Sequence, residues 1–435
     1  MNNNTKAQTS VVIVGGGIAG LLLASKAGRQ LSSYEQVSVT LIDQNTVHIW
    51  KPMIPAFAAG SISSKYQQIP FLQHGAKNGF GFVPGPLVGV DRQAQTVRVG
   101  SIKDDEGREL VPERTVPYDY LVLALGSKAQ DFGTPGVAEH CWFVDDLPSA
   151  EAFNNRLFNQ IVRTASFGKP FHVAVVGAGS TGVELIAEII EVAELASTYS
   201  EFDIRSLMET TLIQAGPEIL KGMDQPVVDA VRKDLQQQGV KILVDSMVVE
   251  ADADGLKLKN GDRIDTTIAV WSAGIAARDA VAEIEGLEKS KGGQIIVGPT
   301  LQSVNDERIF AIGDCSSYTP KGAERPLPPT AEVARKQALH LAAQLSRLRG
   351  NEDPLRTFEF QSAGRIVTLG QKRAYGSFTN GKILSKSVIG GSFARFAHEL
   401  LYRRHQIELY GLLKAVAIWI SDLFGSVIRP PIRVS

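Results

Sequence analysis

Two stretches decide the fold of this chain: Val11-Val12-Ile13-Val14-Gly15-Gly16-Gly17-Ile18-Ala19-Gly20 and Val173-Ala174-Val175-Val176-Gly177-Ala178-Gly179-Ser180-Thr181-Gly182. In each, an apolar run predicts a buried strand, and the glycines that follow predict a tight turn into a helix. The first glycine makes the bend, the second lets backbone N–H groups approach a pyrophosphate, and the third lets the helix pack on the strand. A single copy also fits a packing turn that binds nothing, but two copies predict two dinucleotide sites.

Composition agrees with an α/β protein of two or three domains. The 435 residues are 44% hydrophobic, and 45 basic and 46 acidic side chains give a net charge of −1, so no nucleic-acid partner is expected. The two cysteines, Cys141 and Cys315, form neither a disulfide framework nor a metal or redox pair, and they suggest a reducing compartment. No metal cluster is expected, and no uncharged apolar run is long enough to span a membrane.

The two halves follow the same plan. In the first, the predicted strand Val37–Ile42 ends in Asp43, whose carboxylate can accept hydrogen bonds from a ribose hydroxyl. In the second, the strand Thr211–Ile213 ends in Gln214. Between the halves, residues 131–169 carry a Pro-Gly pair and a polar helical stretch, which predicts a linker between domains.

A third signature, Arg308-Ile309-Phe310-Ala311-Ile312-Gly313-Asp314, combines a short strand, a glycine and an aspartate before a helix start. Such an aspartate can hold a ribityl or ribose hydroxyl beside a pyrophosphate. In isolation it fits a helix N-cap equally well, but its place after the second half favours a nucleotide role.

These motifs together resemble the two-dinucleotide-binding flavoproteins, and most closely the type II NADH dehydrogenases, which are single-subunit NADH:quinone oxidoreductases. The resemblance spans nearly the whole chain. The segments that carry it are His48-Ile49-Trp50-Lys51-Pro52, Leu125-Gly126-Ser127, Ser180-Thr181-Gly182-Val183-Glu184-Leu185, Ala311-Ile312-Gly313-Asp314-Cys315 and Tyr402-Arg403-Arg404-His405-Gln406.

The resemblance implies two Rossmann-like domains, with the NAD domain inserted in a discontinuous FAD domain. We expect an FAD domain at 1–140 and 299–350, an NAD(P)H domain at 141–298, and a β-rich segment with amphipathic membrane-associating helices at 351–435. The implied residues for non-covalent FAD are Gly15, Gly17, Ile18, Ala19, Gly20, Asp43, Gln44, Lys51, Ala124, Gly126, Gly313 and Asp314. Those for NADH are Gly177, Gly179, Ser180, Thr181, Gly182, Gln214, Ala273 and Gly274.

Glu184 and Gln214 carry the two sharpest hypotheses about the second site. Glu184 lies one helical turn past the glycines, where it is either a helix-dipole partner or, as the resemblance implies, a group that orients the nicotinamide and influences proton supply. Gln214 replaces the Glu that the family commonly places there, so the chain lacks a charge that repels a 2′-phosphate. We expect NADH to be preferred and NADPH to be tolerated. Whether Arg205 adds attraction is open.

The tail predicts peripheral membrane contact. Its apolar stripes are Phe393, Phe396, Ala397, Leu400 and Leu401, then Leu412, Leu413, Val416, Ile420, Leu423, Phe424 and Val427. Residues 391–435 hold six basic and three acidic side chains, a net charge of +3 that suits anionic lipids, with Trp419 and Tyr402 as expected interfacial anchors. An amphipathic pair buried on the protein's own core or on a dimer partner is the alternative. A hairpin is predicted at Asn380-Gly381.

The resemblance points to ubiquinone or menaquinone as acceptor, with Glu332, Gln337 and Lys372 as catalytic candidates near it. Glu332 stands where relatives typically carry Gln. For Lys372, the alternative interpretation is a solvated lysine at a strand edge. We expect a homodimer on the cytoplasmic face of a bacterial inner membrane. Two other classes stay open: a sulfide:quinone oxidoreductase-like enzyme, which the cysteines argue against, and a flavin-bearing interaction protein that responds to NADH.

Overall fold

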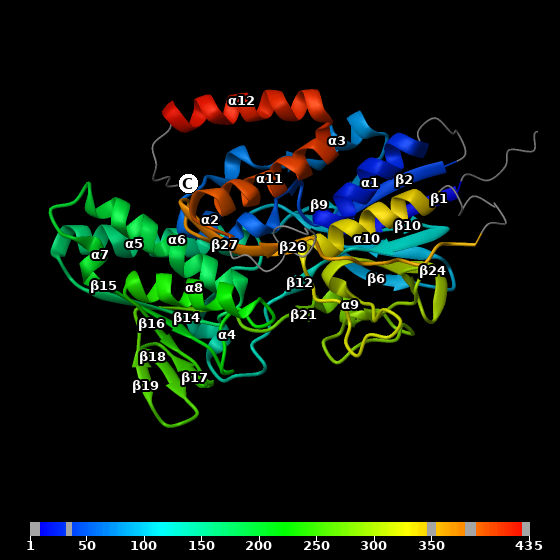
Figure 1. Cartoon of the computed structure of the whole chain (residues 1–435). Helices are drawn as coiled ribbons and strands as arrows, with labels where there is room; N and C mark the ends of the chain where they lie inside the picture. The colour runs from blue at the N-terminus through cyan, green and yellow to red at the C-terminus, as the bar shows by residue number, and fades with distance from the viewer. Residues whose placement is uncertain (1–8, 32–36, 346–353, 379–388, 429–435) are drawn as a thin grey trace, which may run out of the picture. The chain divides into compact units, whose positions relative to one another are not determined.

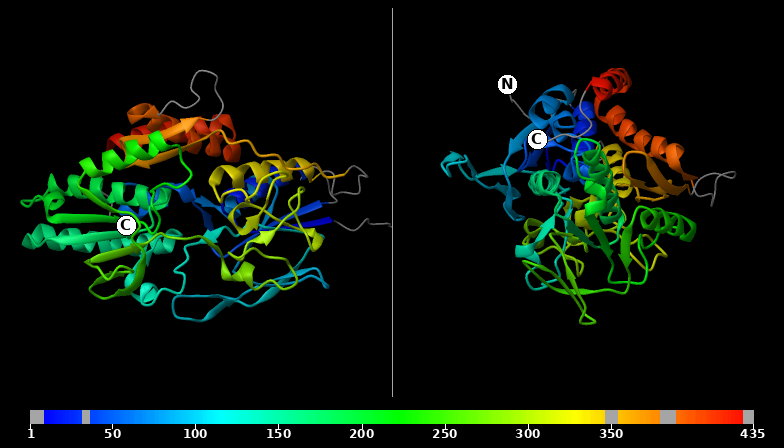
Figure 2. Two further views of the ribbon diagram at one scale, coloured as in Figure 1. Left: turned by 60° about the horizontal axis from the view of Figure 1, so that its bottom comes forward. Right: turned by 90° about the vertical axis from the view of Figure 1, so that its left-hand side faces the viewer.

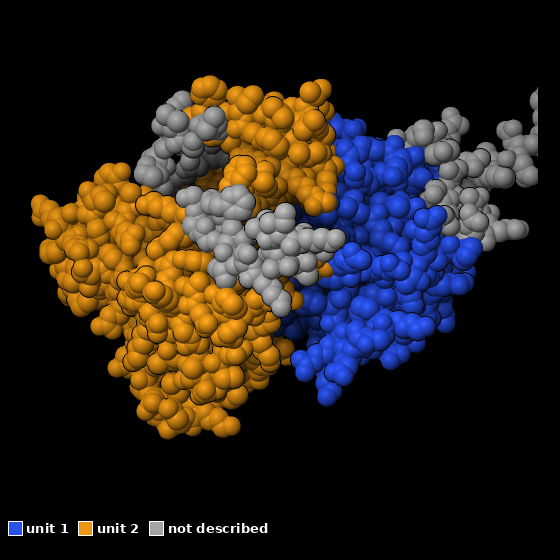
Figure 3. Space-filling view, viewed as in Figure 1, with its two compact units in different colours: residues 1–50, 68–128, 275–361 blue, residues 51–67, 129–274, 362–435 orange. Residues whose placement is uncertain are grey.

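The computed structural model describes residues 9–31, 37–345, 354–378 and 389–428. The chain forms two compact units, coloured blue and orange in Figure 3. Unit 1 comprises residues 1–50, 68–128 and 275–361, and unit 2 comprises residues 51–67, 129–274 and 362–435. Each unit is discontinuous in sequence, and each contains one of the two glycine turns.

Unit 1 is centred on a six-stranded sheet with the strand order β23-β24-β11-β1-β2-β5. All neighbours pair in parallel except β23 and β24. Its apolar strands are buried, as strands of a parallel sheet covered on both faces usually are. The bounds are β1 (Thr9–Val14), β2 (Val37–Asp43), β5 (Gly81–Pro84), β11 (Tyr120–Leu123), β23 (Gln302–Ser303) and β24 (Asp306–Ala311).

Helices α1 and α10 of unit 1 pack against each other, as Figure 1 shows in blue and yellow. The helices are α1 (Ile18–Leu31), α3 (Phe71–Asn78), α9 (Asp279–Ala282), the short 3-10 helix η3 (Gly313–Cys315) and α10 (Ala331–Gln344). An antiparallel sheet joins β6 (Leu87–Asp91), β7 (Thr96–Val99) and β10 (Arg114–Pro117). Short pairs are β3 (Val47–His48) with β4 (Ile69–Pro70), β8 (Ile102–Lys103) with β9 (Glu109–Val111), β12 (Ser127–Lys128) with β21 (Ala276–Ala277), and β22 (Ile295–Ile296) with β25 (Ser316–Ser317).

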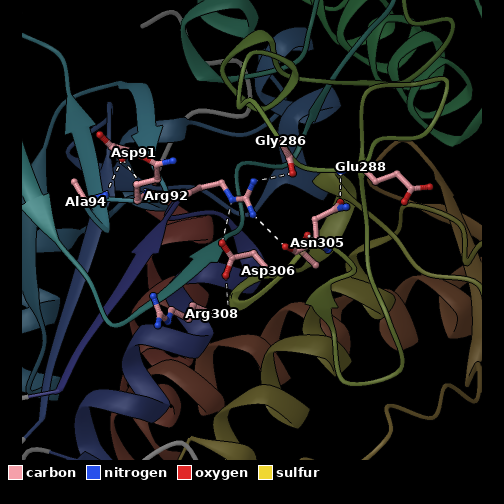
Figure 4. Close-up of polar contacts among 10 residues, drawn as sticks. Asp91, Arg92, Ala94, Gly286, Glu288, Asn305, Asp306 and Arg308 are labelled. Atoms are coloured by element: carbon pink, nitrogen blue, oxygen red, sulfur yellow. Dashed lines mark hydrogen bonds and ion pairs between the residues drawn. The ribbon is translucent and has the colours of Figure 1, made fainter.

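Arg92 joins the early and late parts of unit 1 (Figure 4). Its Nε lies 3.0 Å from Asp306 Oδ2, and its two terminal nitrogens donate to the carbonyls of Gly286 (2.8 Å) and Asn305 (3.1 Å). Asp306 is the first residue of β24, the strand that leads directly to Gly313. One half-buried guanidinium therefore fixes the start of the strand whose end carries the third signature.

Unit 2 is built on a second, five-stranded parallel sheet in the order β13-β20-β14-β15-β16. The strands are β13 (Cys141–Phe143), β14 (Phe171–Val176), β15 (Met208–Ile213), β16 (Val240–Leu243) and β20 (Ile268–Trp271). A small antiparallel sheet follows, with β17 (Val248–Asp252), β18 (Gly255–Leu258) and β19 (Arg263–Asp265). The helical segments are η1 (Lys51–Met53), α2 (Ile54–Ala59), η2 (Ser64–Tyr66), α4 (Val137–His140), α5 (Leu147–Phe167), α6 (Ser180–Ser197), α7 (Ile204–Leu207) and α8 (Gln225–Gln237).

The stretch expected to be a linker is instead part of unit 2. Most of it is the helix α5, which begins with a capping box between Asp146 and Ser149 and ends at Gly168 in the left-handed conformation (φ 62°). Buried residues along α5, such as Phe153 and Leu157, anchor it, and α5 packs against α2. A polar surface on one face of this helix accounts for the linker-like composition.

The C-terminal part of unit 2 consists of β26 (Gly364–Leu369), β27 (Arg373–Phe378), β28 (Ile389–Gly390), α11 (Gly391–Tyr410) and α12 (Leu412–Ile428). The three strands form an antiparallel sheet against which α11 packs, and α11 and α12 lie side by side in Figures 1 and 2. The predicted apolar stripes fall in these two helices. The predicted turn at Asn380-Gly381 lies outside the described residues, and the described hairpin turns at residues 370–372.

The functional boundaries expected from the sequence, 1–140, 141–298, 299–350 and 351–435, stay a prediction about which residues serve each nucleotide. The compact units themselves change over at residues 128/129, 274/275 and 361/362, and residues 51–67 belong to unit 2.

Candidate functional site

The first glycine turn has one open position between two crowded ones. At Gly15, which has φ 105°, a Cβ would collide with the Ala124 backbone at the end of β11, and at Gly20 it would collide with the Gly15 carbonyl. At Gly17 a Cβ would meet nothing within 4 Å. The first and third glycines are thus required by packing, whereas the second leaves room for a ligand at the N-terminus of α1. This is the arrangement that a pyrophosphate needs, so the residues fit a dinucleotide.

The side chain of Asp43 holds the backbone of this turn. Asp43 Oδ2 accepts from Gly16 N at 2.6 Å, and its Oδ1 accepts from Asn45 N at 2.7 Å. Burial raises the pKa of the Asp43 carboxyl, and these two hydrogen bonds act in the opposite direction. Each carboxylate oxygen has further acceptor capacity for a ribose hydroxyl. The neighbouring Gln44 is exposed, and the structure gives no contact that assigns it to a ligand.

His48 holds the same turn through the carbonyl of Gly16, a role that the sequence motif around His48 does not reveal. Its Nδ1 lies 2.8 Å from the Gly16 carbonyl oxygen, and the imidazole is buried. Burial lowers the His48 pKa from 6.5 to about 4, so the ring is neutral near pH 7 and Nδ1–H is the donor. Gly16 is therefore held on both sides, by Asp43 at its N–H and by His48 at its carbonyl.

The third signature lies against the first turn, as the sequence predicts. Gly313, with φ 71°, has the Cβ atoms of Ala19 in α1 and Ala334 in α10 within 3.4–3.7 Å of the position that its own Cβ would occupy. Asp314 Oδ2 accepts from Ser127 Oγ at 2.9 Å. The strands β1, β11 and β24 end next to one another, so Ala124, Gly126 and Asp314 share the carboxyl edge of the sheet. A Cβ on Gly126, which has φ 72°, would also meet nothing within 4 Å.

Gln337, expected to contact quinone, is buried, and its Oε1 accepts from Gly313 N at 2.7 Å. The side chain therefore acts on the loop that carries Asp314. Glu332 lies in the first turn of α10, which Thr330 caps, and is half-buried in an ion pair with Lys336 (3.1 Å). These two candidates share one helix but have different surroundings.

The second glycine turn repeats the geometry of the first. A Cβ on Gly177, with φ 102°, would lie 2.7 Å from Ala273 N, and on Gly182 it would collide with the Gly177 carbonyl. At Gly179 it would meet nothing within 4 Å. Ser180 and Thr181 are exposed in the first turn of α6, a helix whose first N–H groups have no side-chain cap. Unit 2 thus offers a second open helix N-terminus suited to a pyrophosphate.

Gln214 occupies in unit 2 the place that Asp43 occupies in unit 1. Its Oε1 accepts from Ala178 N at 3.0 Å, as Asp43 accepts from Gly16 N. The amide keeps the hydrogen bond but lacks the charge. Arg205, in contrast, lies before β15 and donates to the carbonyls of Met208 and Gln238. Six residues of strand, about 20 Å, separate it from Gln214, so it does not contribute at that strand end.

The end of β20 closes the other side of this turn. Ser272 Oγ donates to the Gly177 carbonyl at 3.0 Å, and Ala273 lies against Gly177. Gly274 has φ 73° and lies beneath the Phe132 ring. The residues expected from the sequence to bind the second nucleotide therefore lie at one edge of the sheet. Arg205, whose contribution the sequence left open, lies at the other end of β15.

The two cysteines are buried free thiols in different units. Burial raises the pKa of Cys141 to about 11 and that of Cys315 to about 12, so both are protonated at neutral pH and are poor nucleophiles. Cys315 Sγ lies 3.3 Å from the Leu123 carbonyl. In the part of the chain that the structure describes, no group of three or more His, Cys, Asp or Glu side chains could hold a metal ion.

Comparison with known proteins agrees with this geometry. The family model described as pyridine nucleotide-disulphide oxidoreductase matches residues 9–338. A type II NADH:quinone oxidoreductase from Haemophilus influenzae is 33% identical, covering 98% of this chain and 99% of the relative, and one from Staphylococcus epidermidis is 27% identical over 92% and 96%. The chain belongs to the type II NADH:quinone oxidoreductases. The resemblance stated from the sequence is thereby confirmed.

Solved structures support the fold of this oxidoreductase. NDH2 from Plasmodium falciparum, determined in complex with NADH, superposes with a TM-score of 0.82 at 17% identity, covering 98% of this chain and all of that one. The sulfide:quinone oxidoreductase from Aquifex aeolicus gives a TM-score of 0.73 at 18% identity, covering 93% and 92%. The predicted α/β class with Rossmann-like parallel sheets is confirmed.

Within the oxidoreductase, Glu184 contacts the C-terminal sheet. Its Oε1 accepts from Thr368 N in β26 at 3.1 Å. Two further glutamates continue along the same face of α6: Glu188 accepts from Ser61 Oγ (2.5 Å) and Gln371 Nε2 (2.8 Å), and Glu191 accepts from Gln371 N (2.5 Å). The helix that opens at the second glycine turn thus holds the β26–β27 hairpin along its length. The sequence shows the spacing of these acids but not their partners.

Lys372 and Lys51 are exposed. Lys372 lies at the turn between β26 and β27, two residues beyond Gly370. Lys51 is the first residue of η1 and belongs to unit 2, whereas the other residues assigned to FAD belong to unit 1. The assignments of Lys51 to FAD and of Lys372 to catalysis stay predictions.

Proposed function

We propose that this chain is an FAD-dependent NADH:quinone oxidoreductase of the respiratory chain that pumps no protons. The observation that carries the proposal is the pair of equivalent glycine turns, each with an open second glycine and each with a strand-end acceptor on the turn, Asp43 in one and Gln214 in the other. Two sites of this kind suit one resident and one exchanging dinucleotide. The family to which the chain belongs supplies the acceptor, a quinone.

Unit 1 would hold FAD without a covalent bond. The N-terminus of α1 would bind its pyrophosphate, Asp43 a ribose hydroxyl, and Asp314 a ribityl hydroxyl. When bound, FAD accepts a hydride from NADH and passes the electrons to the quinone, with the overall change NADH + H⁺ + quinone to NAD⁺ + quinol. Gln337, through the N–H of Gly313, and Ser127, through the carboxylate of Asp314, would keep the loop in place for this contact.

Unit 2 would hold NADH. The N-terminus of α6 would bind the pyrophosphate, and Gln214 would bind the adenosine ribose at the end of β15. Since an amide both donates and accepts, it would bind a 2′-hydroxyl and would not repel a 2′-phosphate, so NADH is preferred and NADPH is tolerated. We further propose that Glu184 positions the nicotinamide. The bond from Thr368 N supports this assignment, because it fixes the direction of the carboxylate.

The quinone would be ubiquinone or menaquinone, reached at a membrane surface. Support comes from helices α11 and α12. Two polar contacts join the helices: Arg403 pairs with Asp422 (2.7 Å), and Trp419 Nε1 donates to Gln406 (2.8 Å). Several large apolar side chains are left exposed, with Leu413 87%, Phe424 66%, Phe396 59% and Leu412 59% exposed. An exposed apolar surface with a net positive tail suits insertion into an anionic lipid surface.

Tyr402 is not an interfacial anchor, contrary to the expectation from its position. It is buried, its hydroxyl donates to Gln67, and burial raises its pKa. No helix among the described residues could cross a membrane. We propose peripheral attachment through α11 and α12 on the cytoplasmic face of a bacterial inner membrane, as a homodimer. Glu332 and Lys372 remain candidates for contact with the quinone head group.

The test is to purify the full chain in detergent, identify the cofactor by its visible spectrum and extraction, and measure NADH oxidation with ubiquinone or menaquinone analogues. We expect extractable FAD and NADH-dependent quinone reduction. Sulfide as electron donor is the control for the other enzyme class. A chain that takes up FAD but reduces quinone with sulfide and not with NADH would overturn the proposal.

A further inference from the structure

Phe132 is a bulky residue in an unfavourable backbone conformation, and its ring is left in solvent. It has φ 57°, in the left-handed region, and the residue is 62% exposed. This conformation is uncommon for an aromatic residue, costs free energy, and persists only where surrounding contacts impose it. Neither burial of the ring nor local backbone preference explains why a phenylalanine occupies this position.

The surrounding loop is fastened to the carboxyl end of β20. Gln130 N donates to the Ala273 carbonyl (3.3 Å), and Trp271 Nε1 donates to the Gln130 carbonyl (2.9 Å). The Phe132 ring covers Gly274, because a Cβ built on that glycine would lie 2.5 Å from the ring. Gly133 N and Thr134 N both bond back to Asp131, which fixes the turn. The backbone of the loop is thus fixed, and the ring lies with one side on the chain and the remainder open.

The Phe132 ring lies at the carboxyl end of β20, where the strand order of the sheet predicts the nicotinamide half of the dinucleotide. In the order β13-β20-β14-β15-β16, β15 and β20 flank β14 on opposite sides. A ligand of an open parallel sheet crosses the carboxyl edge where the connections change direction, which here is between β14 and β20. With the pyrophosphate at the turn after β14 and the adenosine ribose at Gln214 after β15, the nicotinamide half extends over the end of β20.

Backbone strain in unit 2 gathers at this same edge. Besides Phe132, the described non-glycine residues of unit 2 with positive φ are Leu220 and Asp245. Leu220 N donates to the carbonyl of Ala178 inside the glycine turn (2.7 Å), and Asp245 N donates to the carbonyl of Gly216, two residues after Gln214 (2.9 Å). Strained residues cluster at ligand sites because the surrounding contacts hold them there.

We propose that Phe132 is a binding residue for the nicotinamide half of NADH and offers its exposed face or edge to the planar ring. The inference rests on the proposed function and deepens it by assigning the substrate contact on the β20 side. Contact between two aromatic rings contributes about 0.5–1.5 kcal/mol beyond area burial, which corresponds to a change of about two- to tenfold in Kd. The exposed ring in the free protein is the surface that the ligand covers.

The test compares two ligands that differ only in the nicotinamide. Isothermal titration of the FAD-loaded enzyme measures the Kd of NAD⁺ and of ADP-ribose, for the wild type and for Phe132→Gly. Glycine adopts the positive φ without strain, so this variant is expected to fold. We expect NAD⁺ to bind about two- to tenfold more weakly in Phe132→Gly and ADP-ribose to bind as in the wild type.

Two further variants complete the design. Phe132→Tyr keeps the ring and should bind both ligands as the wild type does, and Phe167→Ala removes another exposed aromatic residue of unit 2 and should change neither Kd. Equal Kd values for NAD⁺ in wild type and Phe132→Gly, or equal loss of both ligands, would overturn the inference. Failure of the wild type to bind either ligand would instead overturn the proposed function.

Discussion

His48 makes the stability of unit 1 depend on pH in a way that one substitution should remove. The imidazole is fully buried and donates from Nδ1 to the Gly16 carbonyl, and burial lowers its pKa from 6.5 to about 4. Above pH 6.5 the ring is neutral in both folded and unfolded chains and contributes no pH dependence. As the pH falls from 6.5 toward 4, only the unfolded chain gains the proton, so stability is lost in that window.

The magnitude follows from the two pKa values. The full effect below pH 4 is about 3.4 kcal/mol, and between pH 7.5 and pH 5.0 it is about 2 kcal/mol. With a urea dependence of about 2–3 kcal/mol per molar, the wild-type midpoint should fall by about 0.7–1 M from this cause. In His48→Asn, whose amide can donate to Gly16 at the same position but does not titrate, this part of the fall should vanish.

The assay is urea unfolding with saturating FAD at pH 7.5 and pH 5.0, followed by tryptophan fluorescence and flavin release. The quantity of interest is the change in midpoint between the two pH values, because the cavity left by asparagine lowers both midpoints alike. His140→Gln, at an exposed histidine, is the control and should behave as the wild type. A His48→Asn midpoint that falls with pH as steeply as that of the wild type would show that His48 is not the source of the pH dependence.

Three other substitutions test separate parts of the molecule. Gln214→Glu should lower the ratio of kcat/KM for NADPH to kcat/KM for NADH by about tenfold or more, because a carboxylate at that strand end repels a 2′-phosphate. An unchanged ratio would show that Gln214 does not contact the adenosine ribose. Glu188→Ala should destabilise unit 2 by about 2–4 kcal/mol, since Ser61 and Gln371 lose their shared acceptor. Glu194→Ala, at an exposed position of the same helix, is the control and should not destabilise it. Equal thermal midpoints for the two variants would contradict this prediction. Leu413→Glu should reduce co-flotation with anionic vesicles while NADH oxidation with a soluble quinone is kept, because it places a charge where the most exposed of the described apolar side chains of α12 lies. Unchanged flotation would show that the membrane contact does not include Leu413.

The fold was predictable because its determinants are local. Asp43 follows Gly15 after one helix and one strand, and Gln214 follows Gly177 after two helices and one strand, so spacing along the chain suffices to place them. The third signature, Gly313-Asp314, is distant in sequence, but its strand pairs with β11 next to β1 and so arrives at the same edge. Resemblance to the family was needed to link the three.

Contacts that depend on packing were not predictable. The sequence predicts that Gln337 contacts quinone. Its amide oxygen accepts from Gly313 N, a contact that depends on how α10 packs against α1. Arg205 is close to Gln214 in sequence, but an intervening extended strand places the two at opposite ends. Tyr402 reads as an interfacial aromatic, and it is buried because α11 presents that face to Gln67. No local signal marks Phe132, whose loop is held by hydrogen bonds of Gln130 to Trp271 and Ala273.

Separating the two half-reactions in the absence of oxygen shows whether electrons pass from NADH through the flavin to quinone. The FAD-loaded enzyme is mixed with NADH and its flavin absorbance is followed; a ubiquinone or menaquinone analogue is then added. We expect complete bleaching by NADH and complete recovery with quinone, with bleaching by NADPH slower. A flavin that NADH leaves oxidised, or that quinone fails to reoxidise after bleaching, would contradict this expectation.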